Sequence, residues 1–280
     1  MITAAHVGIG IKGVEGLQAA RASDYSIGEF KLLRRLLLYY GRENYRRNSY
    51  LICYNFYKNL VLVLPQFWYA FFNGLSGQTI YNPFLFQLYN IFYASLPIVI
   101  YAIFDKESKG SIFMNNPKLY NLGRENKVFN VVSFWTWIFF GFLHSCMITI
   151  FLYFSIGINF NEGDQGYMQD MWSVGMGIFG VLITITNLKV LTMSNTHSPL
   201  SLIVIFGSIV VYIATFAISS EVGVVFGDYG AFKRFKEFNI NVFNIIIRLF
   251  SSGPFYLVLL LNIVSISYFD VALDRFMSLS

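Results

Sequence analysis

The sequence contains little charge. Only 12% of its 280 residues are Asp, Glu, Lys or Arg, whereas soluble domains carry about 25%. Two residues are cysteine, and both of them, Cys53 and Cys146, fall inside long apolar stretches. The sequence therefore does not indicate a secreted domain built on disulfides, and its low charge argues against an ordinary soluble protein.

The sequence is rich in long apolar stretches. Hydrophobic residues make up 56% of the chain, and the mean hydropathy is +0.55. A helix needs about 20 apolar residues to cross a bilayer, and six stretches approach or reach that length: approximately residues 49–72, 84–104, 131–156, 171–191, 199–219 and 252–270. We therefore predict an all-α polytopic membrane protein with six transmembrane helices in residues 49–270 and a short cytosolic tail at 271–280.

Charges between these stretches predict the orientation. A basic stalk at residues 31–48 precedes the first stretch, and the loop at 105–130 holds five Lys or Arg residues. The loop at 157–170 holds three acidic residues and no basic one. Because cytoplasmic loops are enriched in Lys and Arg, we expect the stalk, the loop at 105–130 and both termini in the cytosol. A later basic cluster runs against this pattern, and we take it as a local exception: Lys233, Arg234 and Lys236.

Lys58 is the one charged residue in the run from Ser49 to Phe72. It lies roughly 14 Å along such a helix, near the centre of a hydrocarbon layer about 30 Å thick. A lysine at that depth costs on the order of 2.5–3.5 kcal/mol on insertion scales, so a partner or a function is expected. One helical face collects positions 55, 58, 59, 62 and 66, and four of the five are polar: Asn55, Lys58, Asn59 and Gln66. The alternative is a lysine that reaches the membrane interface or pairs within a helix bundle.

Carboxylates are absent from the same region. No Asp or Glu occurs between Asn44 and Phe104, although a dehydrated cation in a membrane requires anionic oxygen ligands. Amides and one ammonium instead suit a phospholipid headgroup, because the ammonium attracts phosphate or carboxylate and the amides replace water. Gln87 and Asn90 add amides in the second stretch; hydrogen bonding between helices is an alternative role for them.

The first 30 residues do not resemble the rest. Residues 6–11 alternate like a buried strand, and Gly8, Gly10 and Gly13 match the letters of a dinucleotide-binding fingerprint. That interpretation lacks a preceding strand and a following βαβ unit. Because about 30 residues cannot bury a core of their own, we predict that residues 1–30 are the remnant of an α/β domain. His144 lies within an apolar stretch, and we expect it to be a packed, hydrogen-bonded histidine with no metal site.

Several long motifs resemble one protein family. Residues 1–24 begin Met-Ile-Thr-Ala-Ala-His-Val-Gly-Ile-Gly-Ile and end Ala-Ser-Asp. Phe-Tyr-Lys-Asn stands at 56–59 and Gln-Phe-Trp-Tyr-Ala-Phe-Phe-Asn-Gly at 66–74, with Leu-Tyr-Asn at 88–90 and Ser-Leu-Pro at 95–97. These motifs resemble the end of the phosphorylation domain and the fifth and sixth transmembrane helices of type-four P-type ATPases, the phospholipid flippases.

The resemblance implies a carboxy-terminal third of such a flippase, opening at an internal methionine. The whole protein would hydrolyse ATP with magnesium and move phospholipid from the outer to the cytosolic leaflet. The motifs for nucleotide, magnesium and phosphorylation have no counterpart here, so we expect no catalytic residue, no bound cofactor and no ATP hydrolysis by this piece alone. A non-enzymatic membrane scaffold or regulatory stub remains an alternative, and a cation-pump fragment is disfavoured by the missing carboxylates.

The resemblance also implies roles for particular residues. Lys58 and Asn59 would contact and gate the lipid headgroup, and Asn90 would face the same path, which we extend to Asn55 and Gln66. Two prolines interrupt predicted helices and would aid hinge motion or simply cause kinks: Pro65 and Pro97. Further implications are a two-span accessory β-subunit, contact with membrane lipids but not nucleic acid, and residence in the plasma membrane or a Golgi or endosomal membrane.

Overall fold

The computed structural model describes residues 4–13, 17–157, 171–226 and 253–279. These residues form two compact units, one from residues 1–50 with 106–133 and the other from 51–105 with 134–280. The acidic loop charges at 162–170 and the basic cluster at 233–236 lie outside the described residues. The predicted orientation of the termini therefore stays a prediction.

A small parallel sheet opens the first unit. Strand β1 (Ile9–Ile11) pairs with β2 (Tyr25–Ile27), and the short helix α1 (Gln18–Arg21) connects them. Asp24 supports the connection, because its carboxylate accepts a hydrogen bond of 2.7 Å from the Gly8 amide. Gly10 permits the close packing of α1, since a Cβ there would lie 2.6 Å from the Ala19 carbonyl oxygen. The strand expected within residues 6–11 is present, but it covers only Ile9–Ile11.

The remaining elements of the first unit are short helices: α2 (Leu32–Arg35), the π-helix η2 (Leu36–Gly41), α6 (Gly110–Asn115), the 3-10 helix η4 (Pro117–Tyr120) and α7 (Asn121–Arg124). An ion pair between the buried Arg42 and the partly exposed Glu107 links the loop before α6 to the first residues of α3 (Arg42–Phe72). The Arg42 guanidinium donates to both carboxylate oxygens of Glu107, at 2.7 and 2.9 Å, and the Glu43 carboxylate accepts from the Glu107 amide at 3.1 Å. Such two-pronged pairing offsets part of the cost of burying charge.

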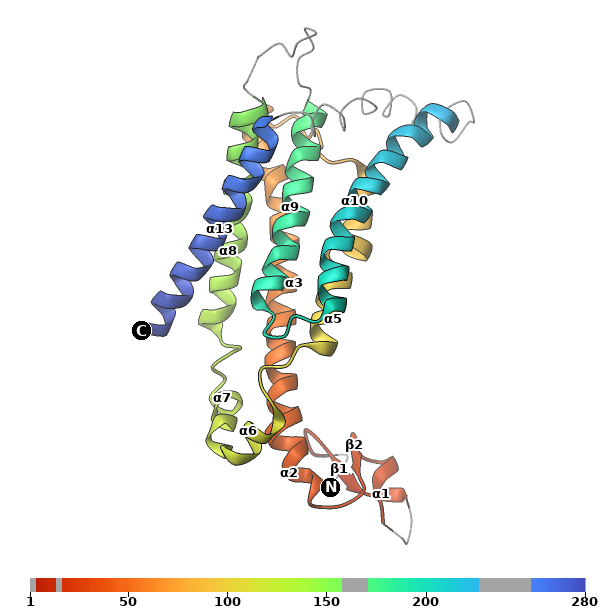
Figure 1. Cartoon of the computed structure of the whole chain (residues 1–280), viewed down its shortest axis with the longest axis vertical. Helices are drawn as coiled ribbons and strands as arrows, with labels where there is room; N and C mark the ends of the chain where they lie inside the picture. Colours follow the sequence, from red (N-terminus) through yellow and green to blue (C-terminus); the bar gives the residue numbers. More distant parts are fainter. Residues whose placement is uncertain (1–3, 14–16, 158–170, 227–252, 280) are drawn as a thin grey trace. The chain divides into compact units, whose positions relative to one another are not determined.

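Helices make up the described part of the second unit. Helix α3 continues into it, followed by α4 (Pro83–Leu88), the π-helix η3 (Tyr89–Tyr93), α5 (Ser95–Phe104), α8 (Val131–Leu152), the π-helix η5 (Tyr153–Gly157), α9 (Met171–Met193), α10 (Pro199–Phe226) and α13 (Gly253–Leu279). Helix α9 contacts α5, α10 and α13 (Figure 1). Its apolar part, Val174–Met193, is more buried than that of the other long apolar helices in the described chain.

In the part of the chain that the structure describes, four helical segments are long and apolar enough to cross a membrane: Pro83–Phe104, Val131–Ser155, Val174–Met193 and Pro199–Ile218. The sequence predicts six. The first predicted stretch is helical within α3, but its lysine and amides lower its hydropathy. The last lies within α13, whose apolar part among the described residues is limited to Phe255–Tyr268. The described residues therefore contain four candidate spans by length and composition, and the prediction of six is not confirmed.

The second predicted stretch is not one regular helix. Between α4 and α5 the backbone passes through the π-helix η3 and then Ala94, whose φ is −117°. Asn82 begins α4 as its cap, because its side-chain oxygen accepts from the amides of Phe84 and Leu85. Pro97 lies in the first turn of α5, where its missing N–H costs no helical hydrogen bond. The irregularity therefore precedes Pro97, whereas Pro65 lies inside a helix that continues to Phe72.

Candidate functional site

Lys58 is buried on α3 and faces the irregular segment between α4 and α5. Its side chain is 5% exposed, and its ammonium nitrogen Nζ donates a hydrogen bond of 3.4 Å to Ser95 Oγ. Ser95 Oγ in turn donates to the backbone carbonyl of Asn90. The Tyr89 hydroxyl donates to the Lys58 carbonyl at 3.3 Å. The side chain and the backbone of Lys58 are thus both hydrogen-bonded to the segment 89–95.

No carboxylate pairs with Lys58 among the residues that the structure describes. An ammonium carries three N–H donors and accepts nothing, and Ser95 takes one of the three. A single hydroxyl leaves most of the charge uncompensated in an apolar environment, which is costly. The arrangement therefore suits an anionic or strongly polar ligand that brings further acceptors.

The other predicted lipid-path residues differ in exposure and in bonding. Asn55 and Asn90 are exposed, and Asn59 is half-buried. Gln66 is engaged within the protein, because its Nε2 donates to the Gln78 carbonyl at 2.7 Å and its Oε1 accepts from the Ile80 amide at 3.0 Å. The structure thus joins Lys58 to the Asn90 backbone through Ser95, while Gln66 fastens the segment that leads into α4.

Ser95 belongs to the Ser-Leu-Pro motif at 95–97, but it was not predicted to be part of the site. Its position two residues before Pro97 is a usable signal, because proline favours the first turn of a helix and serine is common where helices begin. The predicted polar face at 55, 58, 59, 62 and 66 directed attention to α3 alone. The partner that contacts Lys58 comes from a different helix, which helical periodicity does not reveal.

A second buried ammonium lies on α9. Lys189 is 9% exposed, and its Nζ lies 5.0 Å from the ring centroid of Phe140, 5.1 Å from Trp137 and 5.9 Å from Tyr57. Aromatic faces attract a cation at such distances. The Tyr57 hydroxyl is also hydrogen-bonded to His144 Nδ1 at 2.9 Å, which confirms His144 as a packed, hydrogen-bonded residue.

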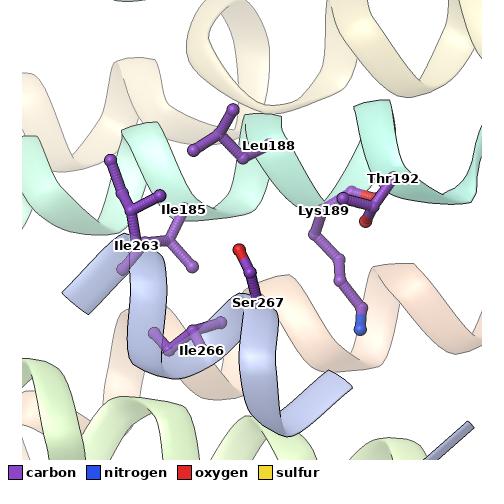
Figure 2. A pocket seen from close by; sticks show the side chains of 7 residues that line it. All are labelled: Ile185, Leu188, Lys189, Thr192, Ile263, Ile266 and Ser267. Carbon is purple, nitrogen blue, oxygen red and sulfur yellow. The ribbon is translucent and has the colours of Figure 1, made fainter. Parts of the chain in front are cut away.

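The cavity next to Lys189 is too small for a headgroup. Figure 2 shows its lining, which comes from α9 and α13: Ile185, Leu188, Lys189, Thr192, Ile263, Ile266 and Ser267. Its volume of about 20 Å³ has room for about one water molecule. Lys189 is therefore held by its aromatic neighbours, and Lys58 is the better candidate for ligand binding.

Comparison with known proteins decides the family. Residues 20–279 match the family model described as "Phospholipid-translocating P-type ATPase C-terminal". The chain belongs to this family. It is 35% identical to Phospholipid-transporting ATPase DRS2 of Saccharomyces cerevisiae over 262 residues, which cover 93% of this chain and 18% of the relative. It is 36% identical to Phospholipid-transporting ATPase ID of Homo sapiens over 214 residues, which cover 76% of this chain and 18% of the relative.

A plant relative is similar over nearly the same extent. Probable phospholipid-transporting ATPase 5 of Arabidopsis thaliana is 33% identical over 259 residues, which cover 91% of this chain and 20% of that protein. The chain thus spans about a fifth of the length of the curated relatives that it matches. Family membership and four apolar helices make this flippase region an integral membrane protein. The resemblance found in the sequence motifs is confirmed.

Proposed function

We propose that this chain forms the carboxy-terminal membrane part of an ATP-driven translocase that moves phospholipid from the outer to the cytosolic leaflet. The relatives are named phospholipid-transporting ATPases. The observation that carries the proposal is the Lys58 ammonium, buried against the irregular segment at 89–95, with two donors left after Ser95 and no carboxylate beside it in the described chain.

The chemistry of this site fits a lipid headgroup. A phosphate or carboxylate of the lipid supplies the anionic oxygens that Lys58 lacks, and hydrogen bonds to charged groups contribute about 1.5–3 kcal/mol each. Asn59, Asn55 and Asn90 provide amides along the same path, and Gln66 holds the segment that leads into α4. Pro65 and Pro97 flank this region and serve as hinge positions.

We propose the same spans, domains and partners as the sequence predicts. Helices α3 and α13 also cross the membrane, which gives six spans and two cytosolic ends. Residues 1–30 complete a phosphorylation domain, 31–48 form the stalk, 49–270 the membrane domain and 271–280 a cytosolic tail. The translocase binds ATP and magnesium outside this region, works with a two-span accessory β-subunit, and resides in the plasma membrane or a Golgi or endosomal membrane.

A chimera tests this function. This chain replaces the segment that it matches in the yeast relative, and phospholipid-stimulated ATPase activity is measured. We expect stimulation by phospholipid, and we expect Lys58→Ala to raise the half-saturating phospholipid about tenfold or more, as loss of a charge-assisted hydrogen bond implies. Lys127→Ala is the control, because Lys127 is exposed and pairs with Glu125.

Two outcomes would count against the proposal. A chimera that is phosphorylated from ATP yet responds to no phospholipid would contradict the function and would favour a scaffold. A chimera whose phospholipid response is unchanged by Lys58→Ala would remove Lys58 from the lipid path.

A further inference from the structure

We propose that Ser95 is a positioning residue for the phospholipid headgroup and acts by holding the Lys58 ammonium beside the irregular segment between α4 and α5. This inference rests on the proposed function of Lys58. Its basis is the chain of hydrogen bonds from Lys58 Nζ to Ser95 Oγ and from Ser95 Oγ to the Asn90 carbonyl.

The direction of these bonds is fixed by chemistry. A serine hydroxyl has one hydrogen to donate and two lone pairs that accept. A backbone carbonyl only accepts, so the Ser95 hydrogen goes to Asn90, and a lysine ammonium only donates, so the Ser95 lone pair receives Lys58. Donation to the carbonyl also makes the hydroxyl oxygen a better acceptor. Ser95 therefore presents its oxygen to Lys58 as long as the segment keeps its shape.

The same segment holds Lys58 at two points. Tyr89, at the start of η3, donates its hydroxyl to the Lys58 backbone carbonyl, and Ser95, at the start of α5, accepts from the side chain. Ala94 lies between them, with its amide bonded to the Tyr89 carbonyl at 3.0 Å. A change in the angle between α4 and α5 would thus shift the ammonium relative to the backbone that carries it. Through Ser95, the position of the ammonium that binds the headgroup therefore depends on the angle between α4 and α5.

Holding the ammonium in place should favour lipid binding. A free lysine side chain carries about 2 kcal/mol of rotamer entropy, part of which a headgroup must otherwise overcome when it binds. Ser95 limits the positions of Nζ before lipid arrives, while two N–H donors stay available among the described contacts. Removing the hydroxyl should therefore weaken lipid binding without affecting the hydrolysis of ATP itself.

The test uses the chimera described above and separates affinity from turnover. We expect Ser95→Ala to raise the half-saturating phospholipid about three- to tenfold, with maximal ATPase activity within twofold of the unsubstituted chimera. Ser95→Cys, which keeps the shape but is a weak acceptor, should behave like Ser95→Ala. Ser95→Thr retains the hydroxyl and should stay within twofold. Ser208→Ala is the matched control, because Ser208 is a buried serine that donates to a backbone carbonyl at 2.7 Å without a lysine partner among the described contacts.

A double-mutant cycle distinguishes positioning from general support of the fold. In a Lys58→Ala background, Ser95→Ala should change the half-saturating phospholipid by less than twofold. An additive effect would overturn the inference, because Ser95 would then act on the helix and not through Lys58. An unchanged response of Ser95→Ala in a chimera that depends on Lys58 would overturn the positioning role alone, whereas an unsubstituted chimera without phospholipid response would overturn both proposals.

Discussion

Two lysines in this membrane domain are buried in different ways. Lys58 contacts a hydroxyl and keeps donors available, whereas Lys189 lies within 6 Å of three aromatic rings. Aromatic faces stabilise a cation, but they offer no hydrogen-bond acceptor whose position the oxygen of a ligand could take over. The first environment is suited to exchange with a polar headgroup, and the second to fixed packing between α3, α8 and α9.

The aromatic environment of Lys189 should contribute measurably to stability. Trp137→Leu removes a ring 5.1 Å from the ammonium, and a cation–π contact in a desolvated site contributes about 0.5–2 kcal/mol. We expect a lower thermal unfolding temperature in detergent, and a smaller loss when Lys189 is replaced by Met. Trp135→Leu on the same helix is the control, because Trp135 is 63% exposed. Equal losses for Trp137→Leu with and without Lys189 would contradict a cation–π contribution.

At the residue scale, the sequence predicted part of the site. Lys58 stands out because it is the one charge in a long apolar run, and that signal requires no structure. Ser95 does not stand out, since its role depends on the bend that brings α5 toward α3. Lys189 was missed for the same reason, because its aromatic partners come from two other helices.

At the scale of elements, glycine decides how closely α9 approaches the chain that enters α4. A Cβ at Gly175 would lie 1.9 Å from the Ile80 carbonyl oxygen, which no real Cβ tolerates, so one backbone must shift. Gln66 holds the neighbouring segment by hydrogen bonds to Gln78 and Ile80. The segment that enters α4 is therefore hydrogen-bonded to α3 and packed against α9.

Gly175→Ala should destabilise the protein by about 1–3 kcal/mol, as overpacking of a close contact does. Gly207→Ala in α10 should be tolerated, because nothing lies within 4 Å of a Cβ built there. Thermal unfolding of the two variants in detergent checks the difference. If both variants unfolded at the same temperature, the close approach of α9 to Ile80 would not exist in solution.

The elements themselves were predicted well where apolar runs are long. The helices α8, α9 and α10 begin where the predicted stretches begin, at 131, 171 and 199, whereas α10 ends at Phe226, beyond the predicted end at 219. The irregular segment 89–95 was not predicted, because it lies inside a predicted stretch without a glycine or proline of its own, and Pro97 drew attention to the following turn. Tyr89 and Tyr93 in this segment are fully buried, and such tertiary contacts cannot be seen in the sequence.

At the scale of the whole molecule, the number of spans is the main open prediction. Among the described residues, hydropathy finds four candidate spans, because α3 carries several polar residues and the described apolar part of α13 is short. The amides and lysine that make α3 a candidate lipid path are the same residues that lower its hydropathy. If α3 crosses the membrane as proposed, its hydropathy is low because it carries this lysine and these amides.

Thiol labelling tests the predicted topology. In a background with Cys53 and Cys146 replaced by Ala, Ser76→Cys in the loop before α4 should react with an impermeant reagent from the outside. Ser111→Cys in α6 should react only after the membrane is permeabilised. Labelling of both positions from the same side would contradict a crossing between α3 and α6 and with it the proposed orientation.

The role of Lys58 in receiving the headgroup is best measured by the uptake of a fluorescent phospholipid with an intact headgroup by cells that carry the chimera. We expect ATP-dependent inward movement that falls at least tenfold in Lys58→Ala at limiting lipid, while Lys127→Ala moves lipid at the original rate. Uptake in Lys58→Ala equal to that of the unsubstituted chimera would contradict the claim that this buried ammonium receives the lipid headgroup.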